Sequence, residues 1–198
     1  VCQITGSDFS GFWNGTEGTL VAEYDYQGTI SSGPLRLAEA PSGNQSISIQ
    51  TSSGNLYFEV YSSTNGGTQA SFTSSPPSIG IATKTAIGFA ANNFAASFNG
   101  STVQTDNSGA MPTGVANAYI GSPGGTYLNG HIARLRYFNK RLPNATLQQL
   151  SDPDPTLNLQ FALNKSLTPV AGPAPSFSRA STGTFFNASG VLTSASIN

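Results

Sequence analysis

Two carboxylates stand two residues apart in the segment Glu23-Tyr24-Asp25-Tyr26-Gln27. Because successive side chains of a strand point to opposite faces, Glu23 and Asp25 are expected on the same face. A retaining glycoside hydrolase uses two carboxyl groups about 5 Å apart, one as nucleophile and one as acid. The third residue of this face is Gln27, whose amide cannot donate a proton as an acid. We therefore interpret the segment as the polar outer face of a strand, and we expect that the chain is not an enzyme.

Histidine and cysteine each occur once, as His131 and Cys2. The usual zinc sites take three or four His, Cys or carboxylate ligands, so this chain lacks the usual zinc-binding sets. A single cysteine also excludes a disulfide within the chain. Ser-His-Asp chemistry would have to use His131, which follows Asn129-Gly130 at the start of a predicted strand. A solvent-facing or loop-anchoring histidine is the simpler interpretation of that position.

Aromatic side chains close to amides offer a different chemistry, the binding of sugars. An aromatic ring stacks on the apolar face of a pyranose, while Asn or Asp side chains fix the hydroxyl groups. Three such pairs are Tyr127 with Asn129 in a glycine-rich loop, Tyr61 with Asn65, and Trp13 with Asn14. The alternative for each aromatic is a core or rim position, and for Trp13 we expect burial, as is usual for tryptophan.

The composition bounds the class of protein. The 198 residues suffice for one large all-β domain, or for one domain plus part of a second. An apolar fraction of 37%, with 12 Phe and 7 Tyr, supports a real core, but only 9% of residues are charged, so the surface must be polar through hydroxyls and amides. A formal net charge of -1 lacks the basic footprint of a nucleic-acid-binding protein. No apolar run of about 18 residues is present, so no membrane insertion is expected.

Short alternating apolar runs between Gly, Pro, Asn and Ser clusters indicate a β-sandwich or barrel. Residues 19–26 place Leu20, Ala22, Tyr24 and Tyr26 on one face, with Val21, Glu23 and Asp25 on the other. Residues 131–138 place Ala133, Leu135 and Tyr137 on one face, with Arg134 and Arg136 on the other. Further strands are predicted at 46–50, 56–61, 69–73, 85–91, 95–98, 101–104 and 118–120, with turns at 53–55, 65–67, 92–93 and 99–100.

One short helix is predicted at residues 142–150, because Pro143 suits a first helical turn and Leu147 and Leu150 are three residues apart. A break in composition follows at residues 151–155. We therefore divide the chain into a sandwich at 1–151 and a segment at 152–198 that is a linker plus the start of a second β module or an arm packing on another chain. Within that segment, a strand is predicted at 156–163 and two short strands around Asn187-Ala188-Ser189-Gly190.

Two segments resemble known families. Residues 119–150, YIGSPGGTYLNGHIARLRYFNKRLPNATLQQL, resemble the closing strand and helix of laminin-G-like/concanavalin A-like domains. The resemblance covers roughly residues 9–151. Its other matching segments are Trp13-Asn14, residues 17–21, Ile87-Gly88-Phe89-Ala90 and Phe98-Asn99-Gly100. The early part is similar to the form of this family found in phage tail proteins. Residues 177–186, FSRASTGTFF, with Ser189-Gly190-Val191-Leu192, are similar to a segment common in phage tail and appendage proteins.

The resemblance implies a jelly-roll sandwich of two antiparallel sheets at the virion surface, outside cells. It implies adhesion to a host-surface glycan, contacts with other virion structural proteins, and a homo-oligomer, most often a trimer. Two alternatives are a purely structural decoration or oligomerisation module and, less favoured, a glycan hydrolase. Domains of this family can also bind calcium, for which Asp106 and Asn107, or Asp25, would supply the oxygen ligands. The alternative for Asp106-Asn107 is an Asx-turn.

Overall fold

The computed structural model describes residues 2–27, 33–38, 44–52, 55–75, 78–121, 127–153, 183–186 and 192–195. The chain divides into two compact units, residues 1–158 and residues 159–198, and each is considered by itself. Several expectations lie outside the described residues: the first two positions of the turn at 53–55, the middle of the glycine-rich loop at 122–126, and the strand at 156–163.

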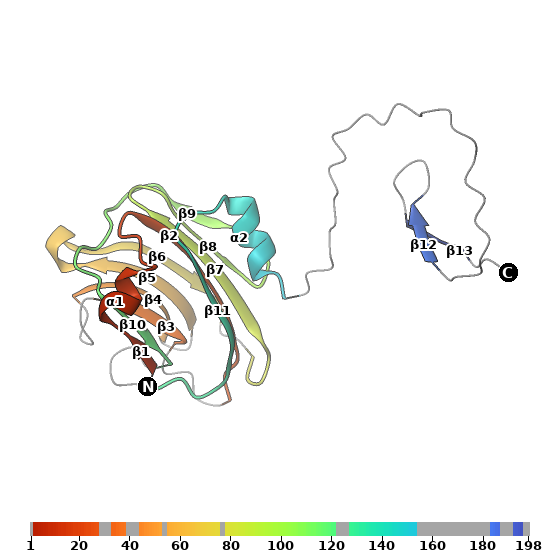
Figure 1. The fold of residues 1–198 in the computed structure, drawn as a ribbon, viewed down its shortest axis with the longest axis horizontal. Helices are drawn as coiled ribbons and strands as arrows, with labels where there is room; N and C mark the ends of the chain where they lie inside the picture. Colours follow the sequence, from red (N-terminus) through yellow and green to blue (C-terminus); the bar gives the residue numbers. More distant parts are fainter. Residues whose placement is uncertain are drawn as a thin grey trace, which may run out of the picture. The chain divides into compact units, whose positions relative to one another are not determined.

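The first unit contains two antiparallel sheets that face each other (Figure 1). The six-stranded sheet has the order β1 (Cys2–Ile4), β10 (Asn117–Ile120), β3 (Leu35–Ala38), β4 (Gln45–Ser52), β5 (Asn55–Ser62) and β6 (Gly67–Ser74). The five-stranded sheet has the order β11 (Ile132–Phe138), β2 (Glu17–Tyr24), β7 (Thr83–Ala90), β8 (Phe94–Phe98) and β9 (Gln104–Asp106). This arrangement confirms the predicted all-β sandwich of two antiparallel sheets.

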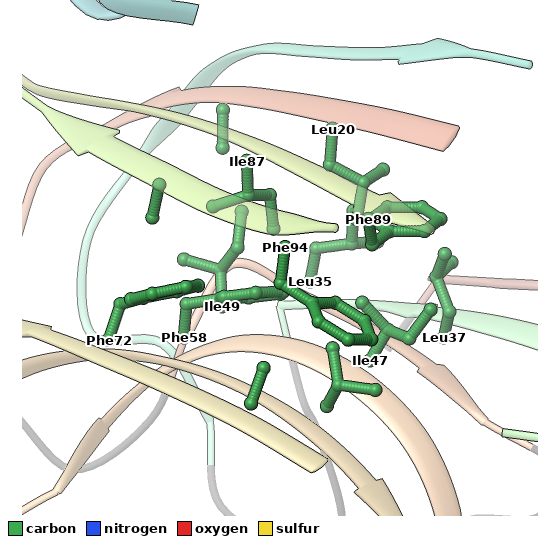
Figure 2. Close-up of a cluster of buried hydrophobic side chains, with 14 of the residues drawn as sticks. Leu20, Leu35, Leu37, Ile47, Ile49, Phe58, Phe72, Ile87, Phe89 and Phe94 are labelled. Atoms are coloured by element: carbon green, nitrogen blue, oxygen red, sulfur yellow. The ribbon is translucent and has the colours of Figure 1, made fainter. Parts of the chain in front are cut away.

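The core lies between the inner faces of the two sheets (Figure 2). Alternate residues of each strand point inward, as the apolar alternation predicts. The fully buried side chains include Leu37, Ile47, Ile49, Phe58, Ile87, Phe89 and Phe94, and the Phe58 and Phe72 rings stack at 5.9 Å. Leu20, Ala22, Tyr24 and Tyr26 belong to this core, which confirms the face predicted for residues 19–26. Each large side chain contributes roughly 1.5–3 kcal/mol by burial.

A second, smaller core lies on the outer side of the five-stranded sheet, beneath α2 (Asn144–Ser151). Its buried members are Val21, Ala86, Ala95 and Leu147. The helix begins directly after Pro143 and ends before Pro153, which confirms the helix predicted at residues 142–150. The short helices α1 (Gly6–Ser10) and η1 (Ser63–Asn65) were not predicted, because three to five residues cannot show helical periodicity.

The tight turns join the strands where their residue types indicate. Asn92 at φ 56° and Asn99 at φ 47° adopt the left-handed conformation that asparagine tolerates. Gly66 at φ 88° follows η1 in the β5–β6 connection, so the turn predicted at 65–67 is confirmed. The strand predicted at 101–104 is wrong in extent, because β9 begins only at Gln104. Ser101 instead closes the Asn99-Gly100 turn through its N–H to the carbonyl of Phe98.

The face predicted for β11 is wrong at its start. The pairing of β11 with β2 shifts register between Ile132 and Arg134, so Ala133 is an extra residue on one strand. Ile132, rather than the exposed Ala133, therefore packs against the core beside Leu135 and Tyr137. The bulge leaves Arg134 exposed opposite Glu23, on the outer face of the sheet.

In the second unit, β12 (Gly183–Phe186) pairs antiparallel with β13 (Leu192–Ala195). The two short strands predicted around residues 187–190 are thus confirmed.

Candidate functional site

The outer face of the six-stranded sheet carries a cluster that we call the tyrosine face, consisting of Arg36, Tyr57, Glu59, Tyr61 and Tyr119. The inner residues of β5 are Leu56, Phe58 and Val60, all buried in the core. Because side chains alternate along a strand, Tyr57, Glu59 and Tyr61 project together from the outer face. They are half-buried rather than fully exposed, whereas Tyr119 of β10 is buried.

The strand register places the charged members in one row across the sheet. Tyr119 of β10 pairs with Arg36 of β3, which pairs with Ser48 of β4. Ser48 in turn pairs with Glu59 of β5. Neighbouring strands are about 4.8 Å apart, so the long Arg36 and Glu59 side chains approach each other above the small serine. Ser48 is buried although it faces outward.

Electrostatic contacts tie this row together. Burial lowers the pKa of the Arg36 guanidinium from its ordinary value, while the Glu59 carboxylate and the Tyr119 hydroxyl act in the opposite direction. Glu59 Oε1 accepts hydrogen bonds from the Tyr57 hydroxyl at 3.2 Å and from Thr68 Oγ1 at 2.9 Å. Burial raises the pKa of Tyr57 above its ordinary value. Two hydrogen bonds therefore fix the position of the Glu59 carboxylate.

Tyr61 completes the tyrosine face, whereas its predicted partner Asn65 has a structural role. Asn65 lies in η1 and is exposed. Its Nδ2 donates to Ser62 Oγ at 2.9 Å, and its carbonyl accepts from Gln69 Nε2 at 2.9 Å. The structure thus places Tyr61 with Tyr57 and Glu59, and it uses Asn65 to close the turn.

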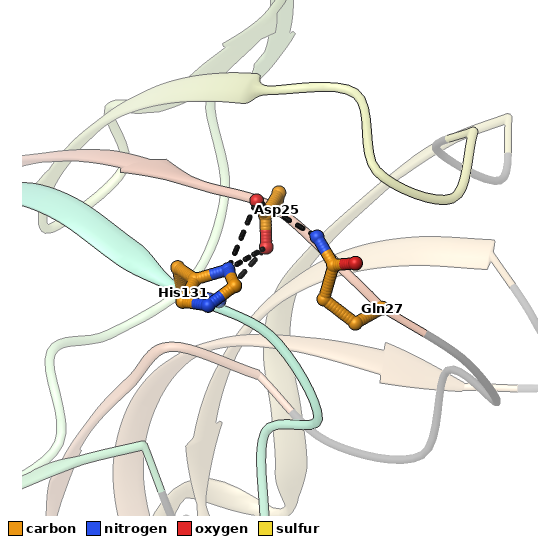
Figure 3. Close-up of polar contacts among 3 residues, drawn as sticks. All are labelled: Asp25, Gln27 and His131. Carbon is orange, nitrogen blue, oxygen red and sulfur yellow. Dashed lines mark hydrogen bonds and ion pairs between the residues drawn. The ribbon is translucent and has the colours of Figure 1, made fainter.

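A second polar group lies where Asp25–Gln27 continues beyond the end of β2 (Figure 3). The Asp25 carboxylate accepts the backbone N–H of His131 at 2.8 Å, and the His131 ring Nδ1 lies 3.1 Å from Asp25 Oδ1. Gln27 Nε2 donates to Asp25 Oδ2 at 3.1 Å. The backbone N–H of His131 is the main reason why the pKa of Asp25 is below its ordinary value.

The predicted pair Tyr127 and Asn129 adjoins this second group. Asn129 is exposed, and its carbonyl accepts the backbone N–H of Gln27 at 2.8 Å. Tyr127 is 63% exposed, among the most exposed large apolar side chains of the described residues. Gly130 is required here, because an added Cβ would lie 2.0 Å from the Asp25 carbonyl oxygen. The role of Tyr127 and Asn129 in ligand binding stays a prediction.

The remaining candidate residues have local roles. Asp106 Oδ1 accepts from Ser108 N at 2.9 Å and Ser108 Oγ at 2.8 Å, which is an Asx-turn. Calcium binding by Asp106 and Asn107 stays a prediction, and no three His, Cys, Asp or Glu side chains gather as a metal site within the described ranges. Glu23 Oε2 lies 4.0 Å from Lys84 Nζ, and Asp25 is engaged by His131, so each of the two carboxylates of this strand has a separate partner.

The pair Trp13 and Asn14 also supports the fold. Trp13 is half-buried rather than fully buried, with its ring 5.7 Å from that of Tyr137, because it caps the edge of the core. The Asn14 backbone N–H donates to the Tyr137 hydroxyl at 2.9 Å, and its Nδ2 donates to the Asn139 carbonyl at 2.9 Å.

The alternation of residues 56–61 (LYFEVY) contained the signal for Tyr57 and Glu59, since Tyr57, Glu59 and Tyr61 share a face. Sequence reasoning identified this strand but only Tyr61 as a site residue. Arg36 and Tyr119 were missed because their proximity depends on the order of strands β10, β3, β4 and β5.

No protein-family model and no curated protein sequence matches the chain. Solved structures do resemble it. The CBM40 domain of the Ruminococcus gnavus IT-sialidase, bound to α2,3-sialyllactose, has a TM-score of 0.58 and 16% identity, covering 69% of this chain and 83% of that one. Domain 4 of the arabinanase AbnA from Geobacillus stearothermophilus, in complex with arabinotriose, has a TM-score of 0.55 and 18% identity, covering 72% and 69%.

A third similar structure is the NanB sialidase from Streptococcus pneumoniae, with a TM-score of 0.58 and 17% identity. The match covers 77% of this chain but only 27% of that one. At such identities the likeness shows the fold, which is the concanavalin A-like jelly-roll expected from the sequence. In the part of the chain that the structure describes, no helix has the length and apolar character needed to cross a bilayer.

Proposed function

We propose that this chain is a non-enzymatic carbohydrate-binding module whose ligand binds on the tyrosine face. The observation that carries the proposal is the pair of half-buried side chains Arg36 and Glu59, flanked on β5 by the half-buried rings of Tyr57 and Tyr61. Tyr119, which is only 5% exposed, pairs with Arg36 and supports this row rather than offering its ring to a sugar. Aromatic rings can stack on the apolar face of a sugar, while guanidinium, carboxylate and hydroxyl groups bind its hydroxyls. Because two hydrogen bonds already fix the Glu59 side chain, less conformational entropy of that side chain would be lost on ligand binding.

Binding is favoured over hydrolysis because glycoside hydrolases typically need two carboxyl groups at the scissile bond. Among the described residues, Glu59 is the carboxylate that the register places on the tyrosine face. No second carboxylate accompanies it among the described members of that face, and its Oε1 is already engaged by Tyr57 and Thr68. The carbohydrate-binding domains with the same fold, one bound to sialyllactose and one to arabinotriose, add support at the level of fold.

The biological setting is also part of this proposal. The similarity of residues 177–186 and 189–192 to a segment of phage tail and appendage proteins supports a virion-surface module that attaches to host glycans, assembled as a trimer with other virion proteins. Sedimentation equilibrium of the full chain tests the oligomer, with a mass of three chains expected. A monomer at all concentrations would contradict this part of the proposal without affecting glycan binding.

A glycan array that includes sialyllactose and arabinotriose tests the proposed function directly. We expect specific binding by the full chain, and a loss of about 1–2 kcal/mol, roughly fivefold to thirtyfold in affinity, for Tyr61→Ala. Tyr127→Ala removes an aromatic ring of equal size from the end of the sandwich and is the matched control. A larger loss in Tyr127→Ala than in Tyr61→Ala would move the site to that end, and no binding to any glycan would favour a structural module.

A further inference from the structure

We infer that the outer face of the five-stranded sheet contains a separate binding site for the carboxylate or sulfate groups of an acidic polysaccharide. The tyrosine face belongs to the other sheet, so the two sites are independent of each other. Helix α2 covers only part of the five-stranded sheet. The helix lies against β7 and β8 (Figure 1). Its Leu147 is fully buried in the small core there. Beside the helix, Val21 is buried, but the neighbouring Glu23 is half-buried and Arg134 and Arg136 are exposed.

The strand register places three positively charged side chains near one another on the outer face of β11, β2 and β7. Arg134 of β11 pairs with Glu23 of β2, which pairs with Lys84 of β7. Arg136 pairs with Val21 in the next row on the same face. Leu150 of α2 and these side chains line a depression of about 40 Å³, which has room for one small anionic group.

The charges of the depression are unbalanced. Its three cationic side chains face one carboxylate, that of Glu23, and this carboxylate already lies 4.0 Å from Lys84 Nζ. Arg134 and Arg136 are both exposed, and neither forms an ion pair or a hydrogen bond with any residue the structure describes. Two neighbouring guanidinium groups can bind a carboxylate or sulfate through parallel N–H···O contacts.

Edge protection and nucleic-acid binding account less well for these charges. Charged residues on an edge strand such as β11 discourage pairing with another sheet, but edge protection does not require Lys84, two strands away, or the depression beside Leu150. A nucleic acid would need a longer basic stripe than three cations, on a chain of net charge -1. A polysaccharide with single carboxylate or sulfate groups on its sugar units fits one small cationic depression better than a nucleic acid does.

Titration of the full chain with polygalacturonate, dextran sulfate and uncharged dextran tests the inference. We expect salt-sensitive binding to at least one of the two acidic polymers and none to dextran. Arg136→Gln should weaken that binding about tenfold, because it removes a charge-assisted contact. Lys140→Gln is the matched control, since it removes one positive charge from an exposed residue outside the depression, and we expect less than a twofold change.

A variant that keeps the charge separates recognition from general attraction. Arg134→Lys/Arg136→Lys retains both charges but loses the planar fork, so a partial loss is expected. Equal losses in Arg136→Gln and Lys140→Gln, no binding to either acidic polymer, or equally tight binding of a single-stranded oligonucleotide would each overturn the inference. Binding of uncharged glycans on the tyrosine face should be unchanged in all these variants, so the two sites fail independently. Self-association of Arg134→Gln/Arg136→Gln without loss of polysaccharide binding would instead identify edge protection and would also overturn it.

Discussion

Tyr57 and Phe58 are neighbours in β5 but should respond to truncation in opposite ways. Phe58 is fully buried, and its ring stacks on that of Phe72 with an interplanar angle of 7°. Truncation of a buried phenylalanine to alanine costs about 3–5 kcal/mol in free energy of unfolding, and loss of the stacked pair favours the upper end. Since domains of this size have a free energy of unfolding of about 5–15 kcal/mol, Phe58→Ala should still fold but with a much lower stability.

Tyr57→Ala should behave differently because Tyr57 is half-buried on the tyrosine face. It loses one hydrogen bond to Glu59 and part of its apolar contact, which together amount to about 1–2 kcal/mol in free energy of unfolding. Glycan binding should suffer more than stability. Tyr57→Phe is the conservative control, since it removes only the hydroxyl group.

Urea unfolding followed by tryptophan fluorescence measures both effects on stability. Trp13 is the single tryptophan, and its ring is 6.0 Å from that of Phe89, so its emission reports on the first unit. An equal loss of stability in Tyr57→Ala and Phe58→Ala would refute the assignment of these residues to opposite faces of β5. The register of the whole tyrosine face would then be wrong.

Three further predictions concern other parts of the first unit. Because the pKa of Asp25 is lowered in the folded state, its carboxylate stabilises the fold fully at pH values above the ordinary pKa of about 3.9, and this contribution is lost as the pH falls through the lowered folded pKa. Melting temperatures measured against pH should therefore fall less steeply below about pH 4 in Asp25→Asn than in the wild type, and parallel curves would contradict the assignment. Gly130→Ala should lower the free energy of unfolding by about 1–3 kcal/mol because its Cβ meets backbone atoms of Asp25, whereas Gly15→Ala, with no atom closer than 3.6 Å, serves as control in the same urea assay. Leu147→Ala should cost about 2–5 kcal/mol and raise hydrogen exchange in α2, and exchange unchanged from the wild type would show that the helix does not depend on this contact.

Much of the fold could be predicted because its strands alternate clearly. Residues 19–26 separate into a core face and an outer face as predicted, and the turns at 65–67, 92–93 and 99–100 follow from residues that tolerate positive φ. The helix at 144–151 follows from proline positions and leucine spacing. These features are local, so each can be recognised within a few residues of sequence.

The features that could not be predicted depend on contacts between segments distant in the sequence. The bulge at Ala133 changes which residue faces the core, and it depends on pairing between β11 and β2. Strands β1 and β3, of three and four residues, were not predicted, and they are held in the sheet by their pairing with β10. Arg36 and Glu59 belong to strands separated by β4, so their contact appears only once the order of strands is known. The candidate site was therefore found in part, through Tyr61, and missed where it depended on that order.

The most direct measurement of the central claim is a titration of the isotope-labelled full chain with sialyllactose and arabinotriose, each at millimolar concentration, followed by the backbone amide resonances in NMR spectra. We predict that at least one of the two sugars shifts the amides of residues 57–61, Arg36 and Tyr119, while those of residues 127–131 stay in place. Shifts confined to residues 127–131, or no shift with either sugar, would contradict the assignment of glycan binding to the tyrosine face.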